Sequence, residues 1–256
     1  MKKLFDENGY IKIQAAEFNL SIDELANKLL AEIKQMKIKS LPAIEDYNLA
    51  DFIDKLHRVD LENESDLLSQ VYQLLPTLPS IWRFASNEKL IDILTETLGV
   101  KSVSLGTVPL IRLDRSHNNL FSTPWHQDYW FSQSSPDSVV VWFPLTKMVK
   151  EIGFLSVIPN PASYGILEFK DHDKGRSFFF EPVESIDETK SITLDCNFGD
   201  ILIFKQSLLH RSGLNNSGRT GVSCQLRYND MYRQDFGFST FTAINSNFVK
   251  DRQGRK

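Results

Sequence analysis

The segment Thr123-Pro-Trp-His-Gln-Asp-Tyr-Trp130 places a histidine and a carboxylate two positions apart. Alternate side chains of an extended chain point the same way, so His126 and Asp128 would present an imidazole and a carboxylate to one point. Such a pair suits a metal ion, but a single His-x-Asp is weak support because it occurs often by chance. A convincing metal site needs a third ligand from elsewhere in the chain.

A second histidine follows an apolar run. The stretch Gly199-Asp-Ile-Leu-Ile-Phe-Lys-Gln-Ser-Leu-Leu-His210 is typical of a turn, a buried strand and a histidine at its far end. Two imidazoles and one carboxylate on one face of a metal leave its other positions open, which is the ligand set of non-haem iron(II) oxygenases. For His210 taken alone, a buried histidine satisfied by hydrogen bonds is the competing interpretation. The remaining histidines stand in charged or polar runs that favour surface positions: His57, His117 and His172.

The flanks of these residues resemble the phytanoyl-CoA dioxygenase family of iron(II)- and 2-oxoglutarate-dependent oxygenases. The motifs occur in the family's order, and the opening Phe5-Asp-Glu-Asn-Gly-Tyr-Ile-Lys-Ile13 is similar to its N-terminal strand. The other motifs that carry the resemblance are Pro124-Trp-His-Gln-Asp-Tyr-Trp130, Ser138-Val-Val-Val-Trp-Phe-Pro-Leu145, Gly153-Phe-Leu-Ser-Val-Ile-Pro159, Gly199-Asp-Ile-Leu-Ile-Phe204, Leu209-His-Arg-Ser-Gly-Leu-Asn-Asn-Ser217 and Gln225-Leu-Arg-Tyr228.

The resemblance implies a double-stranded β-helix, a jelly roll whose two sheets hold iron(II) between them. It implies that His126, Asp128 and His210 are the metal ligands and the catalytic centre, and that 2-oxoglutarate chelates the metal through its keto-acid end. The implied reaction uses molecular oxygen to hydroxylate a small-molecule metabolite and releases succinate and carbon dioxide. The acidic net charge gives no support to a coenzyme A ester, so a small polar metabolite is favoured as substrate.

The distal carboxylate of 2-oxoglutarate needs a cation, because a buried carboxylate without a partner is costly. In the family, an arginine shortly after the second histidine serves this purpose, helped by a serine that Ser212 matches. Trp142 matches the family's tryptophan in the cosubstrate pocket. The arginine is where the chain departs from the family, since an ungapped count places Gly221 at its position.

Three arginines are candidates for this cation. Arg219 is nearest to the expected position, and a shortened loop over 216–220 would bring it into register. Arg227 would share a strand face with Gly221, because 221, 223, 225 and 227 alternate together. Arg112, within Pro109-Leu-Ile-Arg-Leu-Asp114, would come from a neighbouring strand. An ordinary surface position is the competing interpretation for each of them.

Residues around the first ligand pair are candidates for substrate contacts. Gln127, Tyr129 and Trp130 stand close to the expected metal, although packing explains most aromatic clusters. The stretch from Ser163 to Lys190 is long, mixed in charge and poorly periodic. It is interpreted either as a lid over the substrate or as a surface excursion.

The elements that must position these residues change in character near residue 100. Before it the pattern predicts helices: one begins at the capping box of Ser21 and Glu24, one covers 67–75, and one ends at Gly99. After it the apolar runs are short and rich in Val, Ile and Phe, and no helix-length periodic segment separates them. We therefore expect a mainly β protein with flanking helices, a jelly roll, and not a parallel sheet. The expected strands are 108–113, 139–145, 154–158, 192–194, 201–204 and 222–228.

No linker splits the chain convincingly. The prediction is a single oxygenase domain over 1–256, with a mostly helical part (1–100), a jelly-roll core (101–230) and a C-terminal tail (231–256). At 256 residues the chain is long enough to bury a core without disulfides. Two cysteines, Cys196 and Cys224, are too few for a disulfide framework, and neither shows a sign of activation.

Composition excludes several partners. Lys and Arg number 29 against 33 Asp and Glu, giving a net charge of -4, so the basic excess of a nucleic-acid binder is missing. No apolar run approaches the roughly 20 residues of a membrane-spanning helix. The first residues lack a signal-peptide pattern, so we expect a cytoplasmic protein without a membrane partner.

Two other interpretations compete with a 2-oxoglutarate-dependent oxygenase. One is a metal-dependent jelly-roll enzyme, such as an isomerase or hydrolase, in which Gly221 records the loss of 2-oxoglutarate binding. The other is a non-catalytic binding module. The intact set of two histidines and one aspartate argues against the binding module.

Overall fold

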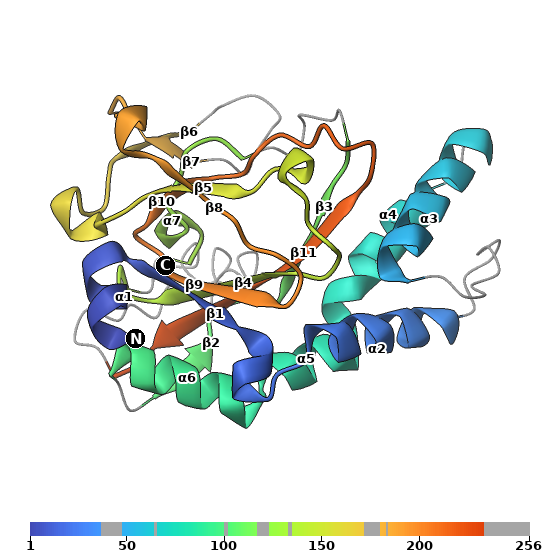
Figure 1. Ribbon diagram of the computed structural model, residues 1–256, viewed down its shortest axis with the longest axis horizontal. Coiled ribbons are helices and arrows are strands. Elements are labelled where there is room, and N and C mark those ends of the chain that lie inside the picture. Colours follow the sequence, from blue (N-terminus) through green and yellow to red (C-terminus); the bar gives the residue numbers. More distant parts are fainter. Residues whose placement is uncertain are drawn as a thin grey trace, which may run out of the picture.

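The computed structural model describes residues 1–36, 48–63, 66–99, 102–116, 123–132, 135–171, 180–182 and 184–232. Within them, two antiparallel sheets face each other and helices cover the outer face of the larger one (Figure 1). This arrangement confirms the prediction of a mainly β jelly roll with flanking helices.

The large sheet has six strands and holds most of the apolar runs. Its order is β1 (Tyr10–Gln14), β9 (Asp200–Lys205), β4 (Val139–Pro144), β11 (Gly221–Asp230) and β2 (Val103–Leu105), with β3 (Leu110–Asp114) also pairing with β11. Strand β11 is therefore bordered by β4 on one side and by β2 and β3 on the other. In the register with β3, Gly221 lies opposite Asp114 and Ser223 lies opposite Arg112.

The small sheet lies across from the large one. It consists of β10 (Leu209–Arg211), β5 (Leu155–Ile158) and β8 (Ile192–Leu194), in that order. A separate antiparallel pair is formed by β6 (Phe169–Asp171) and β7 (Phe180–Pro182). This pair falls within the stretch considered as a lid, of which residues 172–179 and 183 lie outside the described part.

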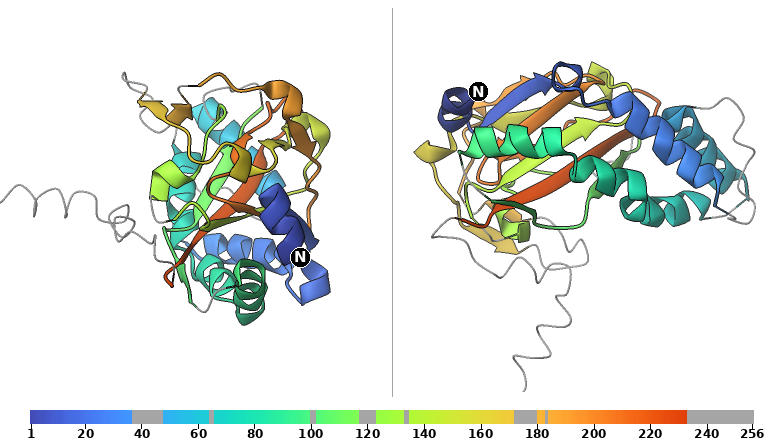
Figure 2. Two further views of the ribbon diagram at one scale, coloured as in Figure 1. Left: turned by 90° about the vertical axis from the view of Figure 1, so that its left-hand side faces the viewer. Right: turned by 90° about the horizontal axis from the view of Figure 1, so that it is seen from below.

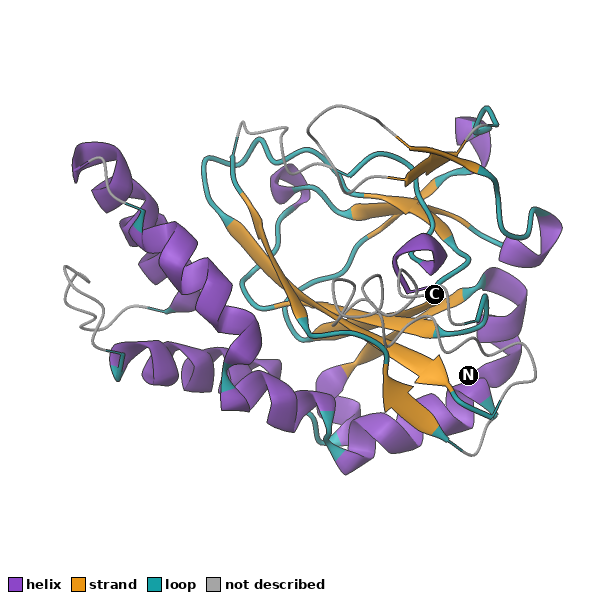
Figure 3. Ribbon diagram, turned by 180° about the vertical axis from the view of Figure 1, so that it is seen from behind, coloured by secondary structure: helices purple, strands orange, loops and turns teal. Residues whose placement is uncertain are grey.

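Most of the helices lie between β1 and β2 in the chain and pack beneath the large sheet (Figures 2 and 3). Ser21 caps the N-terminus of α2 by accepting a hydrogen bond from the Glu24 backbone, as the capping box predicts. Gly99, with φ of 65°, ends α6 at the predicted residue. The helices are α1 (Lys2–Asn8), α2 (Ile22–Lys34), α3 (Leu49–Asn63), α4 (Leu67–Leu74), α5 (Pro79–Ala85), α6 (Glu88–Leu98) and the short α7 (Tyr129–Ser132). None of the helices in the described ranges has the length and apolar character needed to cross a membrane.

Alternation along the central strands divides the core into two layers. On β4, Val139 and Phe143 pack with the helices in one buried cluster. Val140 and Trp142, between them in sequence, join a second cluster with Val157 of the small sheet. Successive strand residues point to opposite faces, so one face of β4 is sealed by helices and the other borders the space between the sheets.

The segment 5–13, which is similar to the family's N-terminal strand, forms a strand only in its second half. The chain first forms α1, which ends at Gly9, and β1 begins only at Tyr10. Gly9 adopts φ of 79°, a left-handed conformation that ends a helix at little steric cost. Helix α5 was also absent from the sequence-based prediction, although Pro79 occupies the first helical position, where proline is favoured.

Candidate metal centre

The two candidate histidine ligands are direct neighbours across a short antiparallel pairing. His126 donates its backbone N–H to the carbonyl of His210 at 3.0 Å, and His210 returns the same bond at 3.0 Å. Residues paired in this way place their side chains on one face. The segment 123–128 is thus attached to β10 so that both imidazoles point into the space between the sheets.

Both imidazoles are oriented by their own chain. Nδ1 of His126 donates to the carbonyl of Pro124 at 2.8 Å, and Nδ1 of His210 donates to the carbonyl of Leu208 at 2.9 Å. Because a carbonyl only accepts, each Nδ1 carries the hydrogen and each Nε2 keeps its lone pair. The two lone pairs face Asp128, whose oxygens lie 3.7 Å from Nε2 of His126 and 4.0 Å from Nε2 of His210.

The three side chains have the charge states that a metal requires. Burial, together with the neighbouring His210, lowers the pKa of His126 to about 3, and burial also lowers the pKa of His210. Burial alone would raise the pKa of Asp128, but the charge of Arg227 and its hydrogen bond to the carboxylate help to outweigh burial, and this pKa is lowered to about 2. The site therefore offers two neutral imidazoles and one carboxylate, the deprotonated forms that bind metal ions.

Asp128 is held from the opposite side by two residues of β11. Arg227 contacts one carboxylate oxygen through Nη2 at 3.0 Å, and Gln225 donates to the other through Nε2. The Arg227 guanidinium also lies over the ring of Phe131, 5.3 Å from its centroid. Within the described residues, His126, Asp128 and His210 are the group that could hold a metal ion, with ligand atoms within 4.8 Å of one another.

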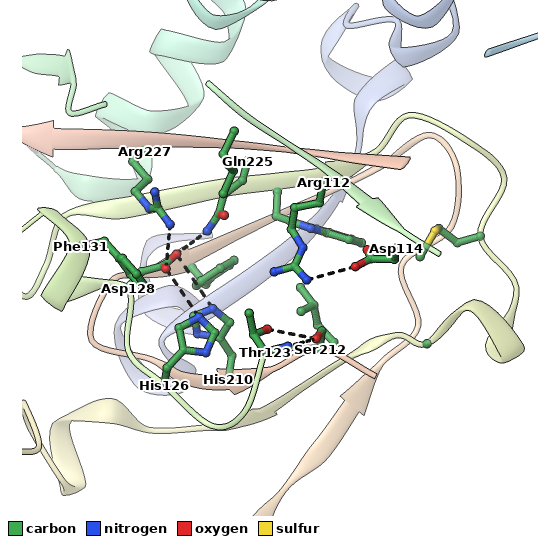
Figure 4. A pocket seen from close by; sticks show the side chains of 16 residues that line it. Arg112, Asp114, Thr123, His126, Asp128, Phe131, His210, Ser212, Gln225 and Arg227 are labelled. Carbon is green, nitrogen blue, oxygen red and sulfur yellow. Dashed lines mark hydrogen bonds and ion pairs between the residues drawn. The ribbon is translucent and has the colours of Figure 1, made fainter. Parts of the chain in front are cut away.

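The three ligands open onto a cavity of about 270 Å³ between the sheets. Figure 4 shows Asp128, Gln225 and Arg227 at one end of it and Arg112 and Ser212 toward the other. The lining also includes apolar side chains from both sheets and their loops, among them Leu110, Phe131, Trp142, Met148, Leu155 and Phe204. A site with convergent polar groups in an otherwise apolar cavity is typical of small-molecule binding.

The far end of the cavity carries an arginine and a hydroxyl. Arg112 pairs with Asp114 at 3.1 Å, and both side chains line the cavity. Ser212 accepts hydrogen bonds from the backbone N–H of Thr123 at 2.7 Å and from its hydroxyl at 3.0 Å. An oxygen that accepts both of these bonds keeps its own hydrogen for donation to another group.

The candidate cations do not all reach this cavity. Arg112 and Arg227 line it, whereas Arg219 is exposed in the loop before β11 and is not among the described lining residues. The space above Gly221 is filled, because a Cβ built there would lie 2.6 Å from Cγ2 of Ile152. A side chain of any kind at position 221 would collide with this neighbour.

The candidate substrate residues lie apart from the cavity, while Trp142 lines it. Gln127 is buried, donates to the carbonyls of Gly165 and Ser207, and accepts from the Leu167 backbone. Trp130 donates to the carbonyl of Leu167 at 3.1 Å. Gln127, Tyr129 and Trp130 are not among the described lining residues. Alternation accounts for Gln127, which lies between the inward-facing His126 and Asp128, whereas Tyr129 and Trp130 belong to α7.

Phe131 and Asp114 line the cavity, although neither was predicted as a site residue. Phe131 follows the first ligand pair and enters the cavity through the turn of α7. Asp114 lies two residues after Arg112 on β3, and this i, i+2 spacing is a signal that could have identified it.

Comparison with known proteins gives one family and a set of similar folds. A model of the phytanoyl-CoA dioxygenase (PhyH) family matches residues 5–220. No curated protein sequence matches the chain.

Three solved structures illustrate the similarity of fold. The non-heme monooxygenase ThoJ in its apo form is 16% identical, with a TM-score of 0.60 over 90% of this chain and 76% of its own. The epimerase SnoN, in complex with Fe3+, alpha ketoglutarate and nogalamycin RO, is 15% identical, with a TM-score of 0.55 over 90% and 82%. EvdO2 from Micromonospora carbonacea var. aurantiaca, complexed with 2-oxoglutarate, is 15% identical, with a TM-score of 0.54 over 91% and 92%.

Proposed function

The chain belongs to the phytanoyl-CoA dioxygenase family, whose members are non-haem iron enzymes that use 2-oxoglutarate, and we propose that it hydroxylates a small-molecule metabolite. The observation that carries this proposal is the convergence of two neutral imidazoles and one carboxylate on a single cavity. Three ligands on one side of a metal leave its other positions open to a cosubstrate and to oxygen.

The chain's own residues would hold and orient the metal. His126 and His210 offer Nε2 atoms whose direction is fixed by the backbone carbonyls behind them. Asp128 offers a carboxylate held by Gln225 and Arg227. When bound, iron(II) and 2-oxoglutarate supply the power to oxidise an unactivated C–H bond with molecular oxygen, and 2-oxoglutarate leaves as succinate and carbon dioxide.

The charges of the cavity fit a dianionic cosubstrate. Among the described lining residues, Arg112 and Arg227 balance Asp114 and Asp128, and the histidines are neutral. A divalent cation alone would add two positive charges to a partly apolar cavity, which is costly. A divalent cation with a doubly charged 2-oxo acid keeps the balance.

The carboxylate ligand favours hydroxylation over halogenation. Halogenating relatives leave the carboxylate position empty for a halide, and here Asp128 fills it. The net charge of -4 gives no support to a coenzyme A ester, so a small polar metabolite is the proposed substrate.

The metal site is tested by anaerobic titration of the purified protein with iron(II). We expect one equivalent in the natural protein and none in His210→Ala. The reaction is tested by measuring oxygen-dependent release of succinate from 2-oxoglutarate across a panel of metabolites, with mass spectrometry of the products to detect added oxygen.

The same experiments separate the alternatives. A protein that binds iron but not 2-oxoglutarate at millimolar concentration would be a metal-dependent jelly-roll enzyme of another class. A protein that binds neither would be a binding module. An unchanged iron stoichiometry in His210→Ala would refute the assignment of His126, Asp128 and His210 as the metal ligands.

A further inference from the structure

Strand β11, which follows the second histidine, cannot carry a cation at position 221. Gly221 lies against Ile152 so closely that a Cβ at position 221 would be 2.6 Å from its Cγ2 atom. Met148, 3.7 Å from the same point, fills the rest of the space, and both neighbours are buried. A charge that meets an anion in this cavity must therefore come from another position.

The partner of Arg227 is Asp128, one of the three candidate metal ligands. The Arg227 guanidinium contacts the Asp128 carboxylate at 3.0 Å and lies over the Phe131 ring, so it belongs to the metal end of the cavity. Moving it to a second carboxylate would leave Asp128 without its counter-charge. Breaking such a buried pair is strongly unfavourable.

Arg112 occupies the remaining position. It lies opposite Ser223 on the strand that borders β11, and residues paired across a sheet share a face. Its side chain enters the cavity (Figure 4), and its ion-pair partner Asp114 lies opposite Gly221 in the pairing of β3 with β11. Asp114 anchors the guanidinium through an ion pair on the same strand.

Ser212 completes this end of the cavity. Its oxygen accepts two hydrogen bonds from Thr123, so its hydroxyl hydrogen is left to be donated. An arginine and a hydroxyl donor at the same end of a cavity form a site for a carboxylate, because charge-assisted hydrogen bonds to a carboxylate are the strong ones.

On the basis of the proposed function, we propose that Arg112, with Ser212, binds the distal carboxylate of the 2-oxo acid cosubstrate. In this arrangement the cosubstrate spans the cavity, with its keto-acid end toward His126, Asp128 and His210. Asp114 acts as a positioning residue for Arg112. In this arrangement the cation of the cosubstrate site comes from β3, which pairs with β11.

The test compares two ligands that differ only at the distal end. Calorimetric titrations of 2-oxoglutarate and of 2-oxopentanoate are carried out on manganese-loaded, oxygen-free protein. Both ligands have five carbons and the same keto-acid end, but 2-oxopentanoate lacks the second carboxylate. We expect the natural protein to prefer 2-oxoglutarate by at least about thirtyfold, the lower limit for a desolvated charge pair.

Arg112→Ala should abolish this preference while the affinity for 2-oxopentanoate stays within about twofold. Arg112→Lys should keep part of the preference, because it keeps the charge but loses the planar guanidinium. Arg83→Ala is the matched control, since Arg83 is three-quarters exposed on α5. Manganese stoichiometry and the thermal unfolding midpoint verify that each variant is folded, and Arg112→Gln replaces Arg112→Ala if the latter does not fold.

The outcomes are distinguishable. If the natural protein binds neither ligand, the proposed function fails. If it prefers 2-oxoglutarate and Arg112→Ala keeps that preference, the assignment to Arg112 is overturned while the proposed function survives. Arg219→Ala and Arg227→Ala, run in parallel, then identify which arginine carries the interaction.

Discussion

Replacing Arg227 by methionine should destabilise the metal-free protein by about 3 kcal/mol, near the lower end of the range for a broken buried ion pair. The carboxylate of Asp128 is 1% exposed and the side chain of Arg227 is 11% exposed, so water cannot replace the lost partner. Methionine keeps the unbranched stem and its packing, and it removes only the charge and its hydrogen bonds.

The magnitude follows from the geometry. At 3.0 Å the attraction between two unit charges is roughly 5 kcal/mol at an effective dielectric constant of about 20. Part of this attraction offsets the cost of burying the arginine, a cost that the variant no longer carries. Gln225 still donates to Asp128 in the variant, which places the net loss near the lower end of the range.

The assay is equilibrium unfolding in urea together with thermal unfolding, both in the presence of a chelator. A loss of about 3 kcal/mol corresponds to a fall in midpoint of roughly 6–12 °C for a chain of this size. Arg227→Lys should lose less, because it keeps the charge, and Arg83→Met should change stability by less than about 0.5 kcal/mol. A loss below about 1 kcal/mol in Arg227→Met, or an equal loss in Arg83→Met, would refute the reasoning.

Two further predictions concern packing and the thiols. Gly221→Ala should cost about 1–3 kcal/mol of stability, because the added methyl group overlaps Cγ2 of Ile152, and a fall in the thermal midpoint measures this cost; an unchanged midpoint would mean that Ile152 moves aside freely. Burial raises the pKa of the Cys196 thiol to about 12 and also raises that of Cys224, so at pH 8 both stay protonated and unreactive in the folded protein. A chromogenic disulfide reagent should therefore detect two thiols only after denaturant is added, and rapid labelling of the folded protein would contradict the burial of these residues.

The candidate ligand set was predictable because each part of it follows from a short stretch of sequence. The i, i+2 spacing of His126 and Asp128 predicts a shared direction, and the apolar run before His210 predicts a buried strand that ends at a histidine. The structure brings the three together. Strands of the large sheet were recognisable for the same reason. A continuous apolar run such as 139–144 indicates a buried strand without knowledge of the strands that pair with it.

Which of the candidate residues line the cavity was harder to predict, because this depends on long-range pairing. Arg112 enters the cavity only because β3 pairs with β11 in the register that sets it opposite Ser223, and no local pattern contains that register. Gln127 was considered as a substrate contact from its nearness in sequence to the ligands. Alternation turns its side chain away from the cavity. There its amide donates a hydrogen bond to the carbonyl of Ser207 and accepts one from the backbone N–H of Leu167.

Gly221 and Arg112 are two parts of one packing arrangement. A glycine at position 221, read alone, suggests that the cosubstrate site was lost. In the folded chain Ile152 uses the space that the glycine leaves, and the adjacent strand brings a guanidinium to the same end of the cavity. The buried distal carboxylate of a 2-oxo acid requires a positive charge close to it. An arginine on either strand can provide that charge, provided that its guanidinium reaches the carboxylate. Under the proposal for Arg112, a glycine at position 221 is therefore compatible with binding of a 2-oxo acid, and the titration of 2-oxoglutarate decides between this and loss of the cosubstrate site.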